Sequence, residues 1–543
     1  MAALSAKQPE LEMKDGNLQF NAAAGTGAEV LLVFGPLYAS LYVDGIFHAR
    51  ERRPAPDAPY NITFPTGVLF EPHTPSDGTR ILEELPLSDE VTFDRAQCAL
   101  LLNAPEDAIA LAQKLSASAE KTELLGRAVR QAFAHTKQQA MDNALAGERE
   151  AALTRMSNIT DLYSHLPHGI TTPQNPAHLA THLPTHSPHV AIIGDLSLPQ
   201  CKHYRVDQKV EQLQSLGLRV SVFSRSDLEA FKAATSTFSH VICYRLPLLP
   251  AVYSALMAAK SSGITVFYET DDLLFDSVAF PGPRASYGLG FKDQEYAELL
   301  ILPPLYLAAM RLCDGVITST PTLRDAILTA LPGMPVHIHA NALGAQHRRA
   351  QKSFSVHNSH EDTDTVNLFY GSGTRALQSD FTDFAESCLV PLFQTLPNIH
   401  LTLAGYLDLP PALSPFSHRI ARQTFTDLAD YWDALAAADI NLAPLSINRF
   451  NHCKSAIKWL EAAMFSVPTV ASATAGFSAV ITRGETGMLC ESAEGWQAAI
   501  TGLANNRSLR SSIGAAAKVQ AERDFSERRL ALNLAHILDI PAT

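Results

Sequence analysis

The sequence predicts an α/β fold in which two units built on parallel sheets follow a smaller β-rich segment. From residue 189 onward, short apolar runs alternate with helix-forming stretches, which indicates parallel strands joined by crossover helices. Most of these runs are apolar along their whole length, as expected of strands that helices cover on both faces. A polar stretch at residues 346–365 interrupts the alternation, which then restarts, so we expect two such units joined by a linker.

The first unit is expected over residues 189–345 and the second over residues 366–525, followed by a helix over 526–543 that could pack back on the first unit. The runs expected in the first sheet are HVAIIGD (189–195), RVSVFS (219–224), HVICYR (240–245), TVFYET (265–270), GVITST (315–320) and VHIHAN (336–341). The runs expected in the second are VNLFYGSG (366–373), IHLTLAGY (399–406), INLAPL (440–445) and PTVASA (468–473). Ligands of such folds bind outside the carboxyl ends of the strands, so a cleft between the units is the expected site.

The remaining N-terminal part is predicted to hold an accessory module. Residues 1–105 are expected to be β-rich, because short apolar runs flank a turn at Asp44-Gly45. Residues 106–188 are expected to be helical at first, since Ala, Leu, Glu and Lys are frequent there, and then to form a linker. Five prolines and six histidines fall within residues 160–189. The histidine spacing follows no metal-ligand motif, so a solvated linker is the favoured interpretation.

Charge and cysteine usage exclude some classes of protein. The chain carries 42 basic and 55 acidic residues, a net charge of −13, which argues against broad nucleic-acid binding because that requires a basic surface. The seven cysteines are scattered and form no CxxC pair, so neither a disulfide scaffold nor a zinc site is expected. The sequence has no signal-peptide pattern and no apolar run of membrane-spanning length, which predicts a cytoplasmic location.

A pattern of two lysines and a glutamate lies late in the second unit. A helix expected from about Cys453 to Phe465 places Lys454, Lys458 and Glu461 at i, i+4 and i+7, which is one face. This face begins near the helix N-terminus, where free N–H groups favour anions. Two lysines there can neutralise a diphosphate, and a carboxylate one turn later can accept hydrogen bonds from ribose hydroxyls. On spacing alone, an exposed Lys/Lys/Glu stripe is the better interpretation.

A glycine-rich turn begins the second unit. In YGSGTRALQSDF (370–381) the turn directly follows a predicted strand and precedes a predicted helix. Gly371 and Gly373 would let the backbone approach a phosphate, and Ser372 and Thr374 would add hydroxyl and amide donors. The pattern is not GxGxxG, and taken alone a simple tight turn explains it equally well.

Two polar segments follow strands of the first unit. Asp271 and Asp272 in YETDDLLFD (268–276) could orient substrate hydroxyls or act as a base, or they could form a helix N-cap with a second acid. His203, Tyr204 and Arg205 in QCKHYRVDQ (200–208) would line the same cleft. Arg205 could bind an anion there, or merely begin a helix.

Taken together, these segments resemble one enzyme family. CKSAIKWLEAAMFSVPTVAS (453–472) is similar to the C-terminal signature of retaining glycosyltransferases of the GT-B fold, of the large family 4 type. YETDDLLF, HYRVDQ and YGSGT resemble a bacterial surface-polysaccharide branch of that family. The resemblance covers about residues 189–540, and its specificity lies in the order and spacing of the motifs.

The resemblance implies two facing Rossmann-like domains and the transfer of a sugar, with retention, from a nucleoside diphosphate to a glycan or lipid-linked acceptor. It implies that Glu461 binds ribose and that Lys454 and Lys458 bind the diphosphate. Further donor contacts are implied for Gly371, Ser372, Gly373, Thr374, Phe425 and Asn451. Acceptor contacts are implied for His203, Tyr204, Arg205 and Arg245, and catalytic roles for Asp271, Asp272 and Lys454.

Neither a cofactor nor a metal is expected, because the lysines can carry the diphosphate charge. The one DxD pattern considered, Asp362-Thr-Asp364, lies in the predicted linker. A lipid-linked acceptor would place the protein at the inner face of the cytoplasmic membrane, in polysaccharide or lipopolysaccharide synthesis.

The sequence departs from the family at one position. The family pattern has two glutamates eight positions apart, and Cys453 stands where the first is expected. The contact of that first glutamate with the transferred sugar is therefore unassigned. Two alternatives stay open. The missing glutamate and the N-terminal β-rich segment favour a catalytically inactive nucleotide- or sugar-binding scaffold, and a sugar-nucleotide epimerase would share the same fold.

Overall fold

The computed structural model describes residues 2–3, 6–14, 17–24, 29–43, 45–52, 62–63, 75–166, 188–288, 290–357, 364–373, 377–424 and 428–541. The chain divides into two compact units. One comprises Met1–Asn143 and Glu150–Thr171, and the other comprises Ala144–Arg149 and Thr172–Thr543.

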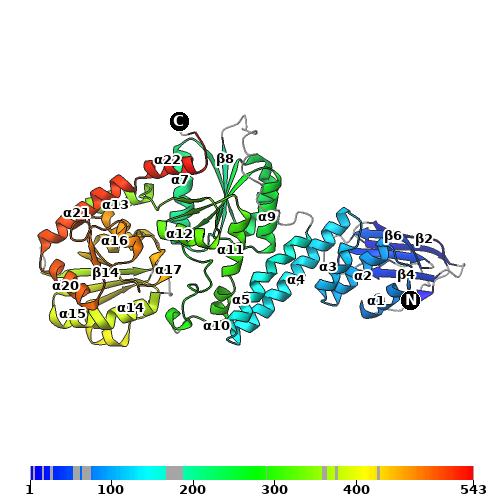
Figure 1. Ribbon diagram of the computed structural model, residues 1–543, viewed down its shortest axis with the longest axis horizontal. Coiled ribbons are helices and arrows are strands. Elements are labelled where there is room, and N and C mark those ends of the chain that lie inside the picture. Colours follow the sequence, from blue (N-terminus) through cyan, green and yellow to red (C-terminus); the bar gives the residue numbers. More distant parts are fainter. Residues whose placement is uncertain are drawn as a thin grey trace. The chain divides into compact units, whose positions relative to one another are not determined.

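The N-terminal unit begins with two small sheets (Figure 1). One sheet has the order β1-β4-β5-β6, with antiparallel neighbours, and the other has the order β2-β3-β7. The strands are β1 (Ala2–Ala3), β2 (Ala6–Lys14), β3 (Asn17–Ala24), β4 (Glu29–Phe34), β5 (Tyr38–Val43), β6 (Ile46–Arg52) and β7 (Ile62–Thr63). The buried Asp94 carboxylate accepts hydrogen bonds from Tyr42 Oη at 2.6 Å and Ser40 Oγ at 2.9 Å, which joins β5 to a following helix.

Helices follow the strands earlier than the sequence predicts. They are α1 (Pro75–Glu84), α2 (Asp89–Leu101), α3 (Pro105–Gln113), α4 (Ala119–Leu145) and α5 (Arg149–Asn158), with a 3-10 turn at Ile159–His165. The expected boundary at residue 106 is therefore corrected to Pro75. The overlooked signal is the start of α2, where the Ser88 side chain accepts a hydrogen bond from Val91 N ahead of Asp89 and Glu90.

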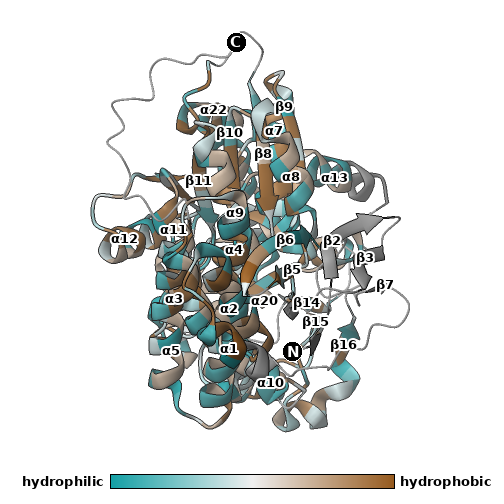
Figure 2. Cartoon of the chain, turned by 90° about the vertical axis from the view of Figure 1, so that its right-hand side faces the viewer, coloured by the Kyte–Doolittle hydropathy of each residue, from teal (hydrophilic) through white to brown (hydrophobic). Residues whose placement is uncertain are grey.

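The larger unit begins with a six-stranded sheet of order β13-β12-β11-β10-β8-β9. The strands are β8 (His189–Gly194), β9 (Arg219–Ser224), β10 (His240–Tyr244), β11 (Thr265–Thr270), β12 (Gly315–Thr318) and β13 (Val336–Ile338). Every neighbouring pair is parallel. Val190 and Ile192 of β8 are fully buried, and Figure 2 shows this strand as hydrophobic.

A second six-stranded parallel sheet follows, with the order β16-β15-β14-β17-β18-β19. The strands are β14 (Val366–Ser372), β15 (Ile399–Gly405), β16 (Ile420–Gln423), β17 (Ile440–Ala443), β18 (Thr469–Ser472) and β19 (Met488–Cys490). The predicted α/β class with two Rossmann-like halves and a preceding antiparallel module is confirmed. The part of the chain that contains β8–β13 is called the first half below, and the part that contains β14–β19 the second half.

Helices lie on the faces of both sheets (Figure 1). In the first half they are α6 (Pro199–Lys202), a π-helical turn at His203–Asp207, α7 (Gln208–Ser215), α8 (Leu228–Ala234), α9 (Pro250–Ser261), α10 (Asp293–Leu300), α11 (Pro303–Leu312) and α12 (Pro321–Ala330). In the second half they are α14 (Gln378–Phe384), α15 (Val390–Thr395), α16 (Leu428–Ala436), α17 (Arg449–His452), α18 (Ile457–Met464), α19 (Ala475–Ser478), α20 (Ala493–Ala504) and α21 (Arg507–Asp524).

Short 3-10 or π turns at Arg225–Asp227, Thr235–Thr237, Arg284–Tyr287, Ala385–Leu389 and Pro411–Arg419 complete the connections.

The expected linker at residues 346–365 is partly helical, which corrects that prediction. Helix α13 spans Ala345–His357, and residues 358–363 lie outside the described part. The segment AQHRRAQ contains several good helix formers. His347 anchors the first turn, because it is fully buried and its Nδ1 accepts a hydrogen bond from Gly344 N at 3.1 Å.

The chain returns from the second half to the first through a short crossing. Leu343 N donates to Phe525 O at 2.9 Å, so the outgoing and returning segments lie side by side. Helix α22 (Glu527–Ile537) then packs beside α7 (Figure 1), and its Leu534 and Ile537 join the hydrophobic core formed by Val190 and Ile242. The first half is therefore completed by residues that follow the second half in the chain.

Candidate functional site

The glycine-rich turn lies at the carboxyl end of β14, where the sequence predicts it. A Cβ atom on Gly371 would lie 2.4 Å from Tyr431 Cε2, so this glycine permits the close approach of an aromatic ring. The carbonyl oxygen of Gly373 accepts a hydrogen bond from Gln200 Nε2 of the first half at 3.1 Å. Ser372 is buried, and Thr374 lies outside the described residues. The groups that contact these glycines here are protein groups, and a phosphate contact stays a prediction.

The helix expected from Cys453 to Phe465 is broken. Helix α17 ends at His452 and α18 begins at Ile457, so Lys454 lies in the connection between them. A Cβ atom on Gly476 would lie 2.0 Å from the carbonyl oxygen of Lys454, which shows how tightly α19 packs against this connection. Lys458 and Glu461 remain on α18, and Lys454 reaches the same region from the loop.

Lys458 carries a buried ammonium group. Its ammonium nitrogen is inaccessible to solvent and has no hydrogen-bond partner among the described residues. It lies 4.4 Å from the centre of the Tyr370 ring, which supplies a cation–π contact. Burial, reinforced by the charge of Lys454, lowers the pKa of Lys458 from 10.5 to about 8. The site therefore holds a positive charge that no anion of the described chain neutralises by direct contact.

Glu461 is buried and accepts hydrogen bonds from three aromatic side chains. Oε1 accepts from Tyr204 Oη at 2.6 Å and from Trp432 Nε1 at 3.2 Å, and Oε2 accepts from Tyr431 Oη at 3.2 Å. Burial raises the pKa of Glu461, although the three donors and Lys458 oppose that shift. Tyr204 belongs to the first half, so the predicted ribose-binding carboxylate is engaged across the cleft.

An ion cluster joins Lys454 to the predicted acidic pair. Arg245 Nε contacts Asp271 Oδ1 at 2.6 Å, and the terminal NH2 group of Arg245 pairs with Asp272 Oδ2. Lys454 Nζ lies 3.4 Å from Asp272 Oδ1. Burial alone would raise the pKa of Asp272, but Lys454 and Arg245 outweigh it and lower the value to about 2. Such a carboxylate is a weak proton acceptor at neutral pH, so its predicted role as a base is disfavoured, whereas hydrogen bonding to hydroxyls remains open to it.

Arg245 itself adopts an unusual backbone conformation. Its φ of 50° lies in the left-handed region, which residues other than glycine rarely adopt. This conformation follows directly after β10 and brings the guanidinium to both aspartates. The predicted contact of Arg245 with an acceptor stays a prediction, because the side chain is nearly buried and already paired.

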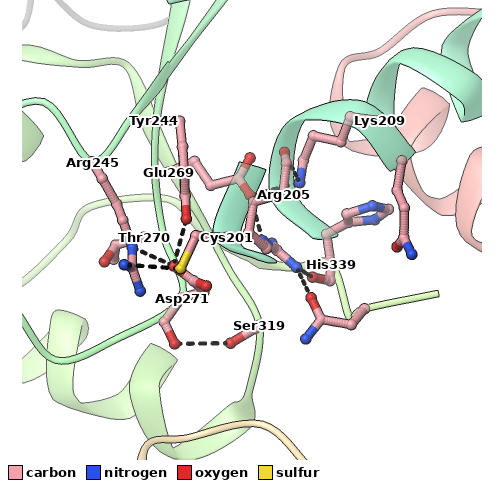
Figure 3. Close-up of polar contacts among 12 residues, drawn as sticks. Cys201, Arg205, Lys209, Tyr244, Arg245, Glu269, Thr270, Asp271, Ser319 and His339 are labelled. Atoms are coloured by element: carbon pink, nitrogen blue, oxygen red, sulfur yellow. Dashed lines mark hydrogen bonds and ion pairs between the residues drawn. The ribbon is translucent and has the colours of Figure 1, made fainter. Parts of the chain in front are cut away.

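Arg205 is a core residue rather than a cleft residue. Its side chain is fully buried, and Nε pairs with Glu269 Oε1 at 2.7 Å (Figure 3). Its NH1 group donates to His339 O at 2.9 Å and to Asn341 Oδ1 at 2.8 Å. Lys209 Nζ contacts the same Glu269 oxygen at 2.6 Å. The expectation that Arg205 faces an acceptor is therefore corrected, because the guanidinium is the buried counter-ion of Glu269.

His203 is also buried, and neither ring nitrogen has a hydrogen-bond partner among the described residues. Burial lowers the pKa of His203 to about 4, so the ring is neutral at pH 7. It packs against Tyr204, His347 and Trp432 at ring-centre distances of 4.8, 5.2 and 5.6 Å. In this arrangement His203 supports the aromatic side chains around Glu461.

One carboxylate near Lys458 was overlooked in the sequence. Asp380, at the start of α14, accepts hydrogen bonds from Ser446 N at 3.1 Å and from Asn451 Nδ2 at 3.2 Å. It thereby ties the loop at Ser446 and the predicted donor residue Asn451, which lies on α17, to the start of α14. The segment YGSGTRALQSDF contained this aspartate, but sequence spacing does not show that it would meet a loop 66 residues later. The other predicted donor residue, Phe425, lies outside the described residues.

The two halves contact each other throughout this region. Cys453, which stands at the position of the missing glutamate, is buried, and its carbonyl oxygen accepts from Thr320 Oγ1 at 2.9 Å. The further contacts are Arg449–Asp276 at 3.0 Å, stacked Phe280 and Phe450 rings at 5.7 Å, and Asn341 Nδ2 donating to Ser455 Oγ at 3.0 Å. The two halves are thus closed over the site.

The fold and the site define a two-domain α/β protein in which helix α18 of the second half carries a lysine with a buried ammonium group and a buried glutamate. Residues 367–506 match the family model described as glycosyl transferases group 1. This match covers the strand, glycine turn and helix that carry Gly371, Lys458 and Glu461. No curated protein sequence matches the chain.

Solved structures of related architecture include three proteins at low identity. Sucrose-phosphate synthase from Thermosynechococcus elongatus is 15% identical over 65% of this chain and 98% of its own, with a TM-score of 0.45. Anabaena HepE in complex with UDP and glucose is 12% identical over 65% of this chain and 100% of its own, with a TM-score of 0.44. A putative UDP-N-acetylglucosamine 2-epimerase from Listeria monocytogenes is 12% identical over 66% and 98%, with a TM-score of 0.40.

The described residues lack two further features. They contain no group of three or more His, Cys, Asp or Glu side chains arranged to hold a metal ion. No helix in the same part of the chain is both long and apolar enough to cross a bilayer.

Proposed function

We propose that the protein is a glycosyltransferase that moves a sugar from a nucleoside-diphosphate donor to a hydroxyl of a glycan or lipid-linked acceptor. The match of residues 367–506 to group 1 glycosyl transferases supports the reaction class. Retention of configuration, a role in bacterial surface-polysaccharide or glycoconjugate synthesis, and a position at the inner face of the cytoplasmic membrane belong to the same proposal and rest on the motif resemblance.

The buried ammonium of Lys458 is the observation that carries the proposal. A buried charge without a counter-ion is costly, so such a group is expected where a ligand supplies the opposite charge. The diphosphate of a sugar nucleotide has that charge, and Lys454 lies close enough to Lys458 to depress its pKa and to share the same anion. The Gly371–Gly373 turn would approach the diphosphate from the other side.

In the proposed reaction, negative charge builds on the diphosphate as the bond to the sugar breaks. Lys458, Lys454 and the amides of the glycine turn would stabilise that charge in a cleft from which water is excluded. Glu461 would accept hydrogen bonds from the ribose hydroxyls, and Asn451, held by Asp380, would lie beside the donor sugar. Asp271 and Asp272 would orient the acceptor hydroxyl as hydrogen-bond acceptors. These lysines would carry the charge without a metal ion.

A nucleotide-binding scaffold is the second candidate, and the Cys453 position favours it. The side chain of Cys453 is buried and cannot present a carboxylate to a transferred sugar. In that case the protein would bind a nucleotide without turning over its sugar.

The test is a thermal-shift screen with UDP, GDP, dTDP and CMP, followed by turnover assays with the sugars of the nucleotide that binds. We expect one nucleoside diphosphate to raise the melting temperature and its sugar to be transferred or hydrolysed. Wild-type turnover by both Lys458→Ala and Glu461→Ala proteins would refute the site assignment. Binding without turnover across the donor panel would favour the scaffold, and conversion of the sugar nucleotide without an acceptor would indicate an epimerase.

A further inference from the structure

A chain of hydrogen bonds connects the crossing between the halves to the carboxylate of Glu461. Gly344 N donates to His347 Nδ1 at 3.1 Å, and His347 Nε2 lies 3.0 Å from Tyr204 Oη. Tyr204 Oη lies 2.6 Å from Glu461 Oε1. Because His347 Nδ1 accepts a hydrogen bond, Nε2 carries the ring hydrogen and donates it to the Tyr204 oxygen, which leaves the tyrosine hydrogen for Glu461.

The Gly344 end of this series of hydrogen bonds is fixed to the first half. The side-chain amide of Gln208 bonds to both Ala342 N and Ala342 O, at 3.0 and 2.8 Å, and Glu211 accepts from Ala345 N at 3.1 Å. The crossing segment at Leu343–Gly344 is therefore held by α7, next to the π-helical turn that carries Tyr204. Glu461, in contrast, moves with the second half.

The closed arrangement leaves Glu461 almost inaccessible. Glu461 is 5% exposed. The Tyr204 hydroxyl lies 2.6 Å from Glu461 Oε1, which is the distance of a strong, charge-assisted hydrogen bond. Tyr431 and Trp432, the other two donors, come from the second half itself. Only Tyr204 would be withdrawn from the carboxylate if the halves moved apart.

We propose that Tyr204 is a latch that closes the cleft and that a nucleotide must displace its hydroxyl from Glu461. This inference rests on the proposed function, because it takes Glu461 as the ribose site. The ribose hydroxyl replaces the tyrosine hydroxyl as donor to the same oxygen. Displacement breaks the relay through His347 to Gly344, so nucleotide occupancy is transmitted to the segment where the chain crosses between the halves.

Linkage gives the direction of the effect. If the nucleotide binds only when Tyr204 has left Glu461, its apparent dissociation constant is the intrinsic constant divided by the fraction of unlatched protein. Removing the tyrosine hydroxyl raises that fraction and must tighten binding. Hydrogen bonds to charged groups contribute about 1.5–3 kcal/mol, which corresponds to a tenfold to hundredfold change.

The experiment compares wild type with Tyr204→Phe, which keeps the ring and removes the hydroxyl. Tyr268→Phe is the matched control, because it is also a buried tyrosine of the first half, and its hydroxyl donates to Leu246 O within that half. Binding of UDP, GDP and dTDP is measured by calorimetry, and hydrogen exchange is followed in peptides covering residues 341–350. Tyr204→Phe is expected to bind the nucleotide at least tenfold more tightly and to exchange faster at Gly344, whereas Tyr268→Phe matches wild type.

Each outcome separates the latch from the proposed function. A dissociation constant for Tyr204→Phe within twofold of wild type, or a weaker one, overturns the latch while leaving nucleotide binding intact. If neither wild type nor Tyr204→Phe binds any of the nucleotides, the proposed function fails, and unchanged exchange at Gly344 would then overturn the latch as well. If Tyr204→Phe does not fold, His347→Phe keeps a ring, removes the donor to Tyr204 and is expected to shift both measurements in the same direction.

Discussion

Replacement of Lys458 by methionine should make the empty protein more stable while it weakens nucleotide binding. Methionine retains most of the side-chain volume and removes the charge. The pKa of Lys458 falls from 10.5 to about 8 on folding, so the unfolded chain binds more protons between these values and the full cost of burying the ammonium is present below pH 8. That cost is about 3 kcal/mol, at 1.36 kcal/mol per pKa unit.

Loss of the cation–π contact with Tyr370 offsets part of this gain. The contact at 4.4 Å contributes about 1 kcal/mol. We therefore expect Lys458→Met to raise the free energy of unfolding by about 2 kcal/mol at pH 7. The gain should shrink as the pH rises from 8 towards 10.5, because the lysine of the wild-type protein then loses its charge.

Tryptophan fluorescence during urea unfolding measures this change in the right part of the molecule. The three tryptophans, Trp432, Trp459 and Trp496, all belong to the second half. In parallel, calorimetry with the nucleoside diphosphate that binds wild type should show about a hundredfold weaker affinity, because a buried charge pair with the ligand is lost. Wild-type affinity should also decline above pH 8.

Lys454→Met is the matched control, since Lys454 is ion-paired with Asp272 and should lose rather than gain stability. A Lys458→Met protein that is less stable than wild type and binds the nucleotide equally well would refute the reasoning. Lys458 would then be a structural lysine whose stem and ring contact matter more than its charge.

Asp272→Asn should lower the free energy of unfolding by about 2 kcal/mol above pH 4, because folding lowers the pKa of Asp272 from 3.8 to about 2. The wild type loses this contribution as the pH falls from 4 towards 2, and acid titration of the melting temperature measures the loss. Arg205→Met should cost about 3 kcal/mol, because it leaves the buried Glu269 with a single cation, and thermal melting by circular dichroism tests it. Unchanged stability with weaker acceptor binding would instead return Arg205 to the cleft. Gly371→Ala should cost about 1–3 kcal/mol by urea unfolding, since the new Cβ would lie 2.4 Å from Tyr431 Cε2, and an unchanged midpoint would show that the ring can move aside.

The two sheets could be predicted because their signal is local. A strand covered on both faces must be apolar along its length, and a crossover helix must follow it. The alternation of such segments from His189 onward is therefore sufficient to predict two parallel sheets. The predicted N-terminal boundary at residue 106 is wrong because α1 and α2 both begin within a short polar stretch, in which the Ser88 cap of α2 is an easily missed signal. The break between α17 and α18 could not be predicted from residue spacing, because the connection packs against a distant segment, where a Cβ atom on Gly476 would lie 2.0 Å from the Lys454 carbonyl oxygen.

The sequence indicated which residues gather on one element, but it did not indicate which distant residues they contact. The sequence indicates that Lys458 and Glu461 share a helix face, and the structure places both on α18. It does not indicate that Tyr204, 257 residues away from Glu461, donates to that carboxylate. The sequence also left two roles open for Arg205, and the choice depended on Glu269, which is 64 residues away. Pairings of this kind are decided by tertiary packing, which residue spacing along one element does not contain.

The crossing at Leu343 and Phe525 has a consequence for engineering the protein. Because α22 returns to supply Leu534 and Ile537 to the core of the first half, the second half is an insertion between two parts of the first rather than a domain joined end to end. A chimaera that exchanges the nucleotide specificity proposed for the second half should therefore replace the segment between these two crossing points as a single cassette and keep α22 of the host. A fragment of the first half that ends at residue 345 would lack Leu534 and Ile537 of its own core, even though the cut leaves both sheets intact.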